Sequence, residues 1–435
     1  MIENIKSKID AKKAVIGVIG LGYVGLPLIC EFVKNGFYVV GFDTDRKKID
    51  KLNRSESYIG HIPPAKLCEM NKSGKFRATS SFAEAKETDI LIICVPTPLT
   101  KNREPDMSYI VSSCNALAPY VHKGHLISLE STTYPGTCQE VLKPIFENGS
   151  GLTANKDFFI VFSPEREDPN NKDYNISSIP KIVGSDSSES LEAACLLYGH
   201  VVNKTIPVSS TRVAEAAKLI ENIFRGVNIA LVNELKMLFH KMGIDVWEAI
   251  NAAATKPFGF MPFYPGPGLG GHCIPIDPFY LTWKAREYDF STKFIELAGE
   301  INTKMPHYVA DRVVMALNEH KKPIKGSKIL LVGLAYKKDV DDMRESPSLK
   351  LMELLEGKGA IVYYHDPFIL SIPVNRDYPQ YTDRRSVSME HADIYDCILI
   401  ATAHSNIDYA SLQRRAKLIV DTRNVISKEN NVYSG

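Results

Sequence analysis

The sequence lacks the features that mark membrane proteins, secreted proteins and nucleic-acid-binding proteins. Its longest apolar runs, such as Ile90 to Val95, have the length of a strand and fall far short of a membrane span. The stretch Met1 to Lys13 alternates charged and apolar residues, so we expect a short amphipathic helix there and not a secretory signal. The net charge of +1 points to neither a nucleic-acid nor a membrane partner. We therefore expect a cytoplasmic protein.

The cysteines also lack any pairing pattern. There are eight of them, and no two form a CxxC pair, which disfavours a zinc cluster or a disulfide scaffold. We expect no metal site. Most of these cysteines should be buried, reduced and inert, because a free cysteine packs as a small hydrophobe. A functional role for any one of them therefore needs a local reason.

The chain of 435 residues is longer than one hydrophobic core usually serves. Buried strand-like runs alternate with helical patterns over residues 1–210 and again over 321–435, which predicts parallel sheets covered on both faces. Residues 211–320 are helical, and Val213 to Met242 contains no proline and a single glycine. We therefore predict an α/β fold: two doubly wound, Rossmann-like domains joined by a central helical domain with a long helix. Such a helix often joins domains or forms a subunit interface, and a homodimer or a higher homo-oligomer is expected.

A dinucleotide-binding fingerprint stands at the start of the first domain. Gly20, Gly22 and Gly25 form GxGxxG directly after the strand ending at Ile19 and directly before a helical pattern. In this order the glycines allow a tight turn, close approach of a pyrophosphate and packing of helix on strand. A second strand ends at Asp43, and an acid there accepts hydrogen bonds from ribose hydroxyls and repels a 2′-phosphate. NAD is therefore favoured over NADP, although Lys48 could soften that preference.

The most unusual segment runs from Tyr264 to Pro278, with several glycines and prolines around Cys273. Such a backbone can approach a ligand closely, and Gly270 and Gly271 can expose the sulfur. A thiol can add to an aldehyde, and the adduct can lose a hydride to become a thioester. A packed, inert cysteine is the competing interpretation, and the residues alone leave the two about equally weighted.

Four other polar residues lie where a ligand could bind, but their roles are ambiguous from the sequence pattern alone. Lys218 and Asn222 are four apart and share a helix face, where they could stabilise an oxyanion. By pattern alone, a solvated helix face is the favoured interpretation. Glu165 and Thr132 each follow a predicted strand at its carboxyl end, where ligands bind in such sheets. A cap or a surface charge is the more common role for an acid such as Glu165 in such a loop.

Taken together, these motifs resemble the UDP-glucose/GDP-mannose dehydrogenase family along nearly the whole chain. The matching segments follow in the family's order: GVIGLGYVGLPL, ICVPTPL, ESTTYPGT, FSPERED, AKLIENIFRGVN, GPGLGGHCIPIDP, GLAYKKDVDDMRESPS and VDTRN. The resemblance implies an NAD-binding first domain (1–210), a central domain for dimerisation and the cysteine loop (211–320), and a domain that binds the UDP-sugar (321–435). It implies oxidation of a primary alcohol at carbon 6 of the sugar to a carboxylate, for surface polysaccharide synthesis.

The resemblance also implies residue roles. Cys273 matches the nucleophile, Asp277 an acid that helps proton transfer, and Glu165 with Thr132 the pair that assists the hydrolytic water. Lys218 and Asn222 match the pair that stabilises the oxyanion. The implied cofactor contacts are Gly20, Gly22, Tyr23, Val24, Gly25, Asp43, Lys48, Pro96, Thr97, Thr132 and Arg344. The implied substrate contacts are Glu165, Arg166, Lys218, Asn222, Arg225, Tyr264, Gly268, Gly270, Tyr336, Lys337 and Arg423.

Departures from the family's glucose branch bear on the substrate. Glucose enzymes usually carry PEFLxEG, whereas this chain reads PEREDPN from Pro164 to Asn170, most similar to UDP-N-acetylglucosamine 6-dehydrogenases, although Asn170 stands where that branch usually has glycine. Residues Lys256 to Phe263 also lack the arginine that glucose enzymes send to the neighbouring subunit's site. UDP-N-acetylglucosamine is therefore the expected substrate, with UDP-ManNAc, UDP-GalNAc and UDP-glucose as alternatives. Two other classes stay open: a dehydrogenase of the hydroxyacid type that transfers a single hydride, and a nucleotide-binding protein without catalysis.

Overall fold

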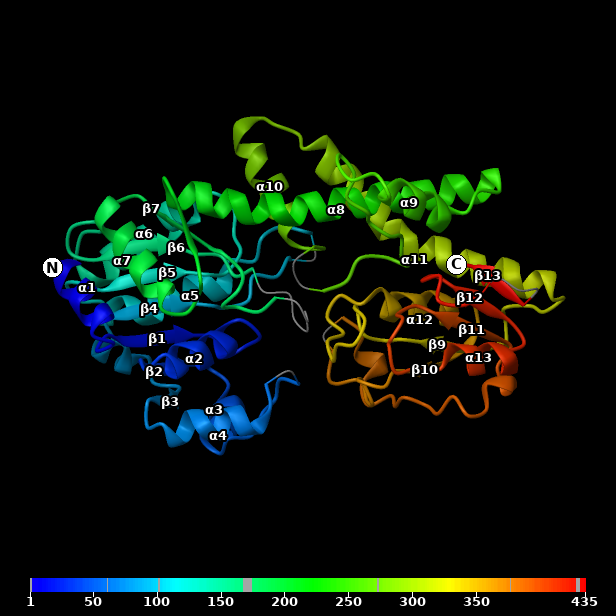
Figure 1. Cartoon of the computed structure of the whole chain (residues 1–435), viewed down its shortest axis with the longest axis horizontal. Helices are drawn as coiled ribbons and strands as arrows, with labels where there is room; N and C mark the ends of the chain where they lie inside the picture. Colours follow the sequence, from blue (N-terminus) through cyan, green and yellow to red (C-terminus); the bar gives the residue numbers. More distant parts are fainter. Residues whose placement is uncertain are drawn as a thin grey trace. The chain divides into compact units, whose positions relative to one another are not determined.

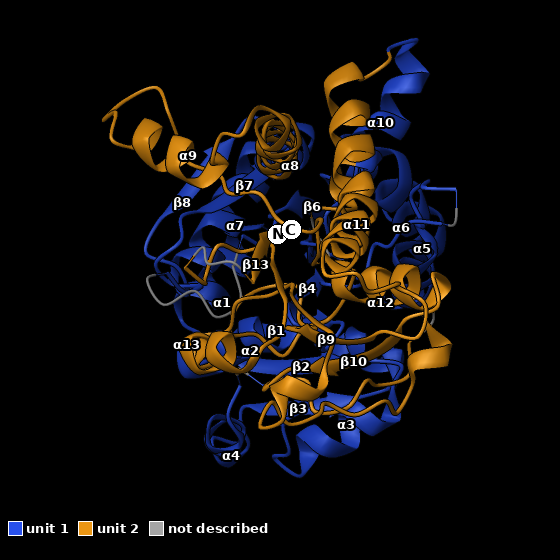
Figure 2. Cartoon of the chain, turned by 90° about the vertical axis from the view of Figure 1, so that its right-hand side faces the viewer, with its two compact units in different colours: residues 1–221, 279–290 blue, residues 222–278, 291–435 orange. Residues whose placement is uncertain are grey.

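A computed structural model describes residues 2–60, 62–100, 102–166, 174–271, 274–375, 377–427 and 431–435. The chain divides into two compact units, which Figure 2 colours blue and orange. Unit 1 comprises Met1–Glu221 and Phe279–Phe290, and unit 2 comprises Asn222–Pro278 and Ser291–Gly435. The division falls within the helix α8 (Thr211–Met242) and within α10 (Asp277–Ala285), so the helical middle of the chain is shared between the units.

Unit 1 is built on a sheet of eight described strands in the order β3-β2-β1-β4-β5-β6-β7-β8, with helices on its two faces (Figure 1). The strands are β1 (Val15–Ile19), β2 (Tyr38–Phe42), β3 (Phe76–Thr79), β4 (Ile90–Ile93), β5 (Leu126–Leu129), β6 (Phe159–Phe162), β7 (Lys181–Ser185) and β8 (Thr205–Val208). The helices are α1 (Ile2–Asp10), α2 (Gly25–Lys34), α3 (Arg46–Asn53), α4 (Pro64–Lys72), α5 (Ser108–Leu117), α6 (Lys143–Ser150) and α7 (Ser188–Gly199). The order reverses between β1 and β4, which makes the carboxyl ends of these two strands the expected ligand site.

One strand pairing departs from the parallel sheet predicted from the sequence. β7 runs antiparallel to β6, with Val161 opposite Ser185, whereas β8 is again parallel to β7. An antiparallel neighbour can be reached without a helical crossover, and α7 then supplies the crossover from β7 to β8. β7, α7 and β8 thus form a strand–helix–strand unit whose strands run opposite to the other strands of the sheet. The antiparallel entry brings Lys181, the first residue of β7, to the edge of the sheet where β6 ends.

Unit 2 holds a second doubly wound sheet, of five described strands, in the order β10-β9-β11-β12-β13. All the pairings are parallel. The strands are β9 (Lys328–Val332), β10 (Ile361–His365), β11 (Cys397–Ile400), β12 (Ile419–Asp421) and β13 (Val432–Ser434). The other helices of the unit are α9 (Val246–Ala254), α11 (Lys293–Glu319), α12 (Pro347–Gly357) and α13 (Tyr409–Arg415). The order reverses between β9 and β11, as it does between β1 and β4 in unit 1.

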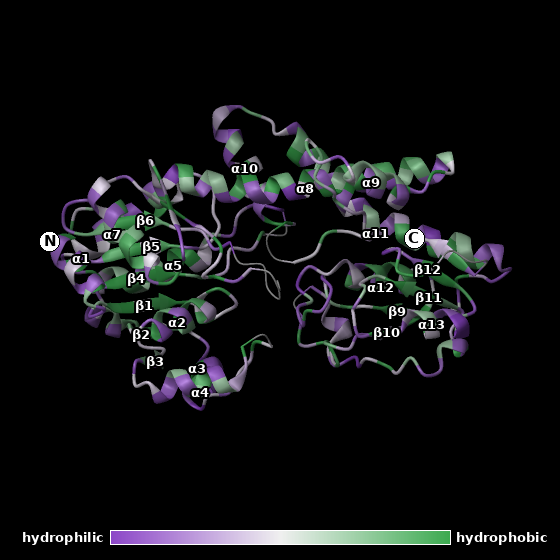
Figure 3. Ribbon diagram, viewed as in Figure 1, coloured by the Kyte–Doolittle hydropathy of each residue, from purple (hydrophilic) through white to green (hydrophobic). Residues whose placement is uncertain are grey.

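The central strands are apolar along their whole length because helices cover both faces of each sheet. Every residue of β4, β5, β6 and β11 is buried, and Figure 3 shows these strands in the hydrophobic colour. In unit 1, one apolar cluster contains Ile16 and Val18 and another contains Ile19 and Leu91, one on each face of the sheet. Alternate side chains of β1 thus pack into two hydrophobic cores, one on each face of the sheet. Among the helices of the described ranges, none combines the length and apolar character that a bilayer crossing needs.

Candidate active site

The glycine loop of unit 1 has the close contacts that a dinucleotide site requires. Gly20 has φ of +95°, and a Cβ there would lie 2.6 Å from the Cys94 carbonyl oxygen. At Gly25, the first residue of α2, a Cβ would lie 2.0 Å from the Gly20 carbonyl oxygen, so helix and turn could not pack with any side chain there. A Cβ at Gly22 would meet no heavy atom within 4 Å. The backbone at Gly22 is thus open to a ligand, and the N-terminus of α2 follows with its free N–H groups.

Asp43 follows β2 directly, beside this loop. Its carboxylate accepts hydrogen bonds from the backbone N–H of Leu21 at 3.0 Å and of Asp45 at 2.9 Å, and Lys48 Nζ lies 3.3 Å from Oδ2. An acid fixed in this position is suited to ribose hydroxyls, so the residues present fit NAD. Tyr23 and Val24 are half-buried within the loop, and Lys48 is a direct neighbour of the acid.

The next two strands present further predicted positions at the same edge. Pro96 and Thr97 follow β4, with Pro96 exposed and Thr97 buried, and the half-buried Thr132 follows β5. Because β1, β4 and β5 are adjacent and parallel, these loops leave the sheet on the same side as Gly20. Within the described ranges, no group of three or more His, Cys, Asp or Glu side chains could hold a metal ion.

Glu165 is held by a buried ionic network that the sequence did not indicate. Lys181 Nζ lies 2.9 Å from Glu130 Oε2 and 3.5 Å from Glu165 Oε2. The hydroxyl of Tyr198 donates to the other oxygen of Glu130 at 2.7 Å, and the Lys181 ammonium lies 5.0 Å from the centre of the Tyr198 ring. Burial raises the pKa of Glu130, while Lys181 acts in the opposite direction. Glu165 is therefore a largely buried, paired acid and not a free surface charge.

The helix α8 buries the two side chains that its sequence pattern left ambiguous. Lys218 and Asn222 are 6% and 0% exposed, so the interpretation as a solvated helix face is wrong. In unit 2, Asn222 Nδ2 donates to the Asp277 carboxylate, and Arg225 donates to Asn222 Oδ1. The Asn222 amide is thus polarised between a cation and an anion. These three residues meet because Asp277, at the end of the glycine-rich segment, begins α10.

The glycine-rich segment packs on unit 2's own sheet loops. A Cβ at Gly270 would lie 2.6 Å from the Cβ of Tyr336, and one at Gly266 would lie 2.6 Å from Arg423 Nη1. Gly268 has φ of +145° and lies against Pro347, and Gly271 donates its N–H to the Arg344 carbonyl oxygen at 3.0 Å. The structure thus brings Tyr336 and Arg423 to this segment. His272 and Cys273 lie outside the described residues.

The remaining predicted substrate and cofactor residues have other partners. Tyr264 donates to Asn251 Oδ1 at 2.9 Å and stacks on Trp247. Arg344 forms an ion pair with Asp342 at 2.6 Å, and Lys337 is half-buried beside Tyr336. In unit 1, Arg166 forms an ion pair with Glu221 at 2.6 Å, and its other guanidinium nitrogen donates to the Pro180 carbonyl oxygen.

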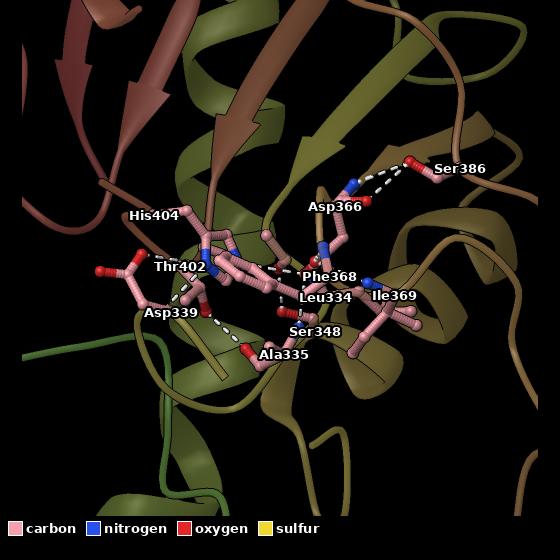
Figure 4. Close-up of polar contacts among 12 residues, drawn as sticks. Leu334, Ala335, Asp339, Ser348, Asp366, Phe368, Ile369, Ser386, Thr402 and His404 are labelled. Carbon is pink, nitrogen blue, oxygen red and sulfur yellow. Dashed lines mark hydrogen bonds and ion pairs between the residues drawn. The ribbon is translucent and has the colours of Figure 1, made fainter. Parts of the chain in front are cut away.

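A loop of unit 2 repeats the turn of the glycine loop in unit 1, but its acid, Asp366, is hydrogen-bonded within the protein (Figure 4). Gly333 has φ of +90°, like Gly20, and Leu334 donates its N–H to Asp366 Oδ2 at 2.7 Å, as Leu21 does to Asp43. Asp366 also accepts the N–H groups of Ala335, Phe368 and Ile369. The loop that carries Tyr336 and Lys337 is thereby fixed at its start.

His404 completes this arrangement. It is fully buried, with Nε2 at 3.1 Å from Asp366 Oδ2, while its Nδ1 accepts the N–H of Asp339 at 3.0 Å. The tautomer that satisfies both contacts carries its proton on Nε2. Burial would raise the pKa of Asp366, but the hydrogen bonds from His404 and the backbone outweigh it and hold that pKa below its usual value. Asp366 therefore has no oxygen left for a ribose.

Sequence reasoning missed Asp366, His404, Lys181 and Glu130. Asp366 could have been found, because it ends the second strand of the second domain in the same way as Asp43 ends that of the first. The other three offer no such signal, since each depends on a contact with residues far away in the chain.

Three family models match the chain in succession. The UDP-glucose/GDP-mannose dehydrogenase family NAD-binding domain matches residues 14–202, the central domain matches 212–304 and the UDP-binding domain matches 330–428. Among similar proteins, the UDP-N-acetyl-D-glucosamine 6-dehydrogenase of Pseudomonas aeruginosa is 35% identical over 93% of both chains. The UDP-N-acetyl-D-mannosamine dehydrogenase of Pyrococcus horikoshii is 36% identical over 95% of this chain and 96% of its own.

Solved structures agree with these matches. The structure of the UDP-D-ManNAc dehydrogenase from Pyrococcus horikoshii superposes with a TM-score of 0.85 at 33% identity, over 95% of this chain and 96% of that one. The two doubly wound sheets and the helical middle predicted from the sequence are thus confirmed, and the first sheet belongs to a domain that binds NAD. The chain is a dehydrogenase of the UDP-glucose/GDP-mannose dehydrogenase family.

Proposed function

We propose that this protein oxidises the carbon 6 alcohol of a UDP-sugar to a carboxylate in a four-electron reaction, through a thioester on Cys273. UDP-N-acetylglucosamine is the proposed substrate, and surface polysaccharide synthesis the proposed role. The observation that carries most weight is the hydrogen-bonded trio of Asn222, Arg225 and Asp277, in which Asn222 and Asp277 are buried. It places an amide donor and a carboxylate together at the end of the glycine-rich segment that contains Cys273.

Each residue of this group has a chemical task in the proposal. The buried Lys218 ammonium and the Asn222 amide stabilise the negative charge that develops on the sugar oxygen as its proton leaves. Asp277 exchanges that proton, since its carboxylate already accepts from Asn222. Cys273 adds to the aldehyde carbon as a thiohemiacetal. The glycine loop of unit 1 would hold NAD, which would supply the hydride acceptor for both oxidations, of the alcohol and of the thiohemiacetal, with two NAD molecules reduced per sugar.

Glu165 takes the final step in the proposal. A water molecule attacks the thioester carbon, Glu165 accepts a proton from it, and the thiol of Cys273 is released together with the carboxylate. Lys181 Nζ lies 3.5 Å from Glu165 Oε2, so this carboxylate is oriented from one side. The half-buried Thr132 follows β5, which lies beside β6, and can hold the same water.

The choice of sugar rests on the PEREDP segment and on the relatives. Arg166, in that segment, is fixed by Glu221 and the Pro180 carbonyl oxygen, so its guanidinium is pre-organised beside Glu165. The similar proteins named above are dehydrogenases of UDP-N-acetyl-D-glucosamine and of UDP-N-acetyl-D-mannosamine. An N-acetylated hexosamine is therefore preferred over glucose, and the gluco epimer is the one we propose.

The test is NADH formation with UDP-GlcNAc, UDP-ManNAc, UDP-GalNAc and UDP-glucose, with reducing equivalents counted per sugar. Two NADH per UDP-GlcNAc, with much slower turnover of the others, is the expected result. Cys273→Ser should abolish carboxylate formation, and Cys68→Ser, a change at a half-buried cysteine on α4, is the matched control. One NADH per sugar, or full conversion by Cys273→Ser, would overturn the thioester route.

We propose further that the protein forms a homodimer through α8. Six large apolar side chains are exposed on this helix at spacings of four and seven, which places them along one side. They are Val213, Ile220, Phe224, Leu231, Leu238 and Met242. Light scattering should give twice the chain mass for the wild type and a shift toward the monomer for Leu231→Glu. A wild-type monomer at micromolar concentration would refute the dimer.

A further inference from the structure

Lys236 is a buried lysine that has no counter-ion within the described ranges. It lies on α8 within unit 2 and is 2% exposed, and among the described residues its Nζ has no hydrogen-bond partner. Two of the other three buried lysines in the described ranges are ion-paired, Lys181 with Glu130 and Lys284 with Glu140. A buried ammonium without a partner costs several kcal/mol in free energy, so such groups are rare in proteins that have no use for them.

The surroundings of Lys236 connect it to the nucleotide-binding part of unit 2. One turn earlier on α8, Asn233 Oδ1 accepts the N–H of Gly266 at 3.0 Å. Gly266 lies against the Arg423 guanidinium, whose Nε donates to the Ala401 carbonyl oxygen at 2.7 Å. Ala401 and Arg423 follow β11 and β12, so this is the carboxyl edge of the second sheet, where doubly wound folds bind their ligands.

Positive charge exceeds negative charge at this place. The charged and titratable groups that act on Lys236 are Arg423 and Asp421 at the end of β12 and Arg312 on α11, and Lys236 in turn acts on His240 of α8. Burial, then Arg423 and Arg312, lower the pKa of Lys236 to about 7, against the effect of Asp421.

Asp421 supplies a single negative charge, which cannot balance three basic side chains. Its carboxylate accepts the backbone N–H groups of Arg423, Val425 and Ile426. Arg312 itself donates to the Ser434 carbonyl oxygen and has no carboxylate partner among the described residues. The cluster of Lys236, Arg423 and Arg312 with one carboxylate therefore keeps an excess of positive charge.

We propose that Lys236 and Arg423 form an anion-binding site that takes the diphosphate of the nucleotide-sugar. This inference rests on the proposed function, and it adds a substrate residue that lies outside the recognised motifs. A uracil ring would not supply the missing charge, whereas a diphosphate brings more than one negative charge and accepts several N–H bonds at once. Residues 330–428, which match the UDP-binding domain, contain Arg423, so a nucleoside diphosphate is the ligand class with the best claim to this site.

Calorimetric titration of the protein with UDP, uridine and inorganic phosphate tests the site without turnover. The variants are Lys236→Met, Lys236→Gln and, as the matched control, Lys241→Met, an exposed lysine on the same helix. Both changes at Lys236 should weaken UDP binding roughly tenfold or more, since a charge-assisted hydrogen bond is lost, and should leave uridine binding unchanged. Lys241→Met should bind UDP as the wild type does. Thermal unfolding of each variant verifies folding, and Lys236→Met should be as stable as the wild type or more so.

A second readout follows from protonation. An anion bound beside Lys236 favours the ammonium form, so UDP binding near pH 7.5 should take up a proton in the wild type and none at this site in Lys236→Met. Titrations in buffers of different ionisation enthalpy measure that uptake.

Three results would overturn the site: unchanged UDP affinity in Lys236→Met, equal losses for UDP and uridine, or inorganic phosphate binding as tightly as UDP. If UDP binding depends on Lys236 while no UDP-sugar yields NADH, the site stands and the proposed function fails.

Discussion

Asp43 and Asp366 occupy equivalent places in the two doubly wound sheets, and we predict that the same substitution has different consequences at each. Asp366→Asn should destabilise unit 2 and leave NAD affinity unchanged. Asp43→Asn should weaken NAD binding about tenfold, or ~1.4 kcal/mol, with a smaller loss of stability. The contrast arises because both carboxylate oxygens of Asp366 accept several hydrogen bonds within the protein, whereas those of Asp43 can still accept hydrogen bonds from a ribose.

The size of the stability loss in each aspartate variant follows from the hydrogen bonds that its carboxylate accepts. Each oxygen of Asp366 accepts two backbone N–H groups, and Oδ2 also contacts His404. An asparagine replaces one oxygen by a donor, so two N–H groups lose their acceptor whichever way the amide turns. At about 1.5–3 kcal/mol for each hydrogen bond to a charged group, the loss is ~3–6 kcal/mol. At Asp43 each oxygen accepts a single backbone N–H, so the loss is about half as large.

The chain offers a separate reporter for each unit. It has two tryptophans, Trp247 in unit 2 and Trp283 in unit 1, so urea unfolding in Trp283→Phe and Trp247→Phe backgrounds follows the units individually. Asp366→Asn should lower the midpoint reported by Trp247. NAD affinity is measured by titration of the same variants. Equal unfolding midpoints for Asp366→Asn and wild type, or equal losses for both aspartate variants, would refute the reasoning.

Three further predictions concern unit 1. Burial, and then His122, lower the pKa of His125 to about 3, so its contribution to stability is complete above about pH 6.5 and is lost as the pH falls toward 3. Unfolding at pH 7.5 and pH 5 should differ by ~2 kcal/mol from this residue, and His125→Gln should remove that difference. Gly25→Ala should abolish NAD binding and lower the melting temperature, because its Cβ would overlap the preceding turn; intact NAD affinity would contradict this. Lys181→Met should destabilise by about 3–5 kcal/mol by leaving Glu130 buried without its cation, and adding Glu130→Gln should restore most of that loss in urea unfolding.

The glycine loop illustrates what could be predicted from the sequence. Gly20, Gly25 and Asp43 act through their nearest neighbours along the chain, and strand–turn–helix geometry fixes which residue types fit each place. The strand ending at Ile19, and the next strand, expected to end at Asp43 and observed to end at Phe42, were predicted for a similar reason, since buried parallel strands are continuous apolar runs. The amphipathic helix expected at the N-terminus is confirmed as α1.

The antiparallel direction of β7 and the short edge strand β3 were not predicted. β3 is only partly buried, with one of its four residues in the core, so its sequence carries a weak periodic signal. The direction of β7 depends on how the chain returns from β6, which is a property of the connection and not of the strand's own residues.

The sequence by itself determined the two nucleotide folds, the helical middle and the residue types for the chemistry, because short-range geometry and apolar periodicity encode them. It left Lys218 and Asn222 undecided, since a helical pattern does not say what covers a polar face. Only the tertiary structure buried them and paired Asn222 with Asp277. The same holds for Lys236. In the sequence it is an ordinary helical lysine, and only the structure shows that it is buried near Arg423, where positive charge is in excess.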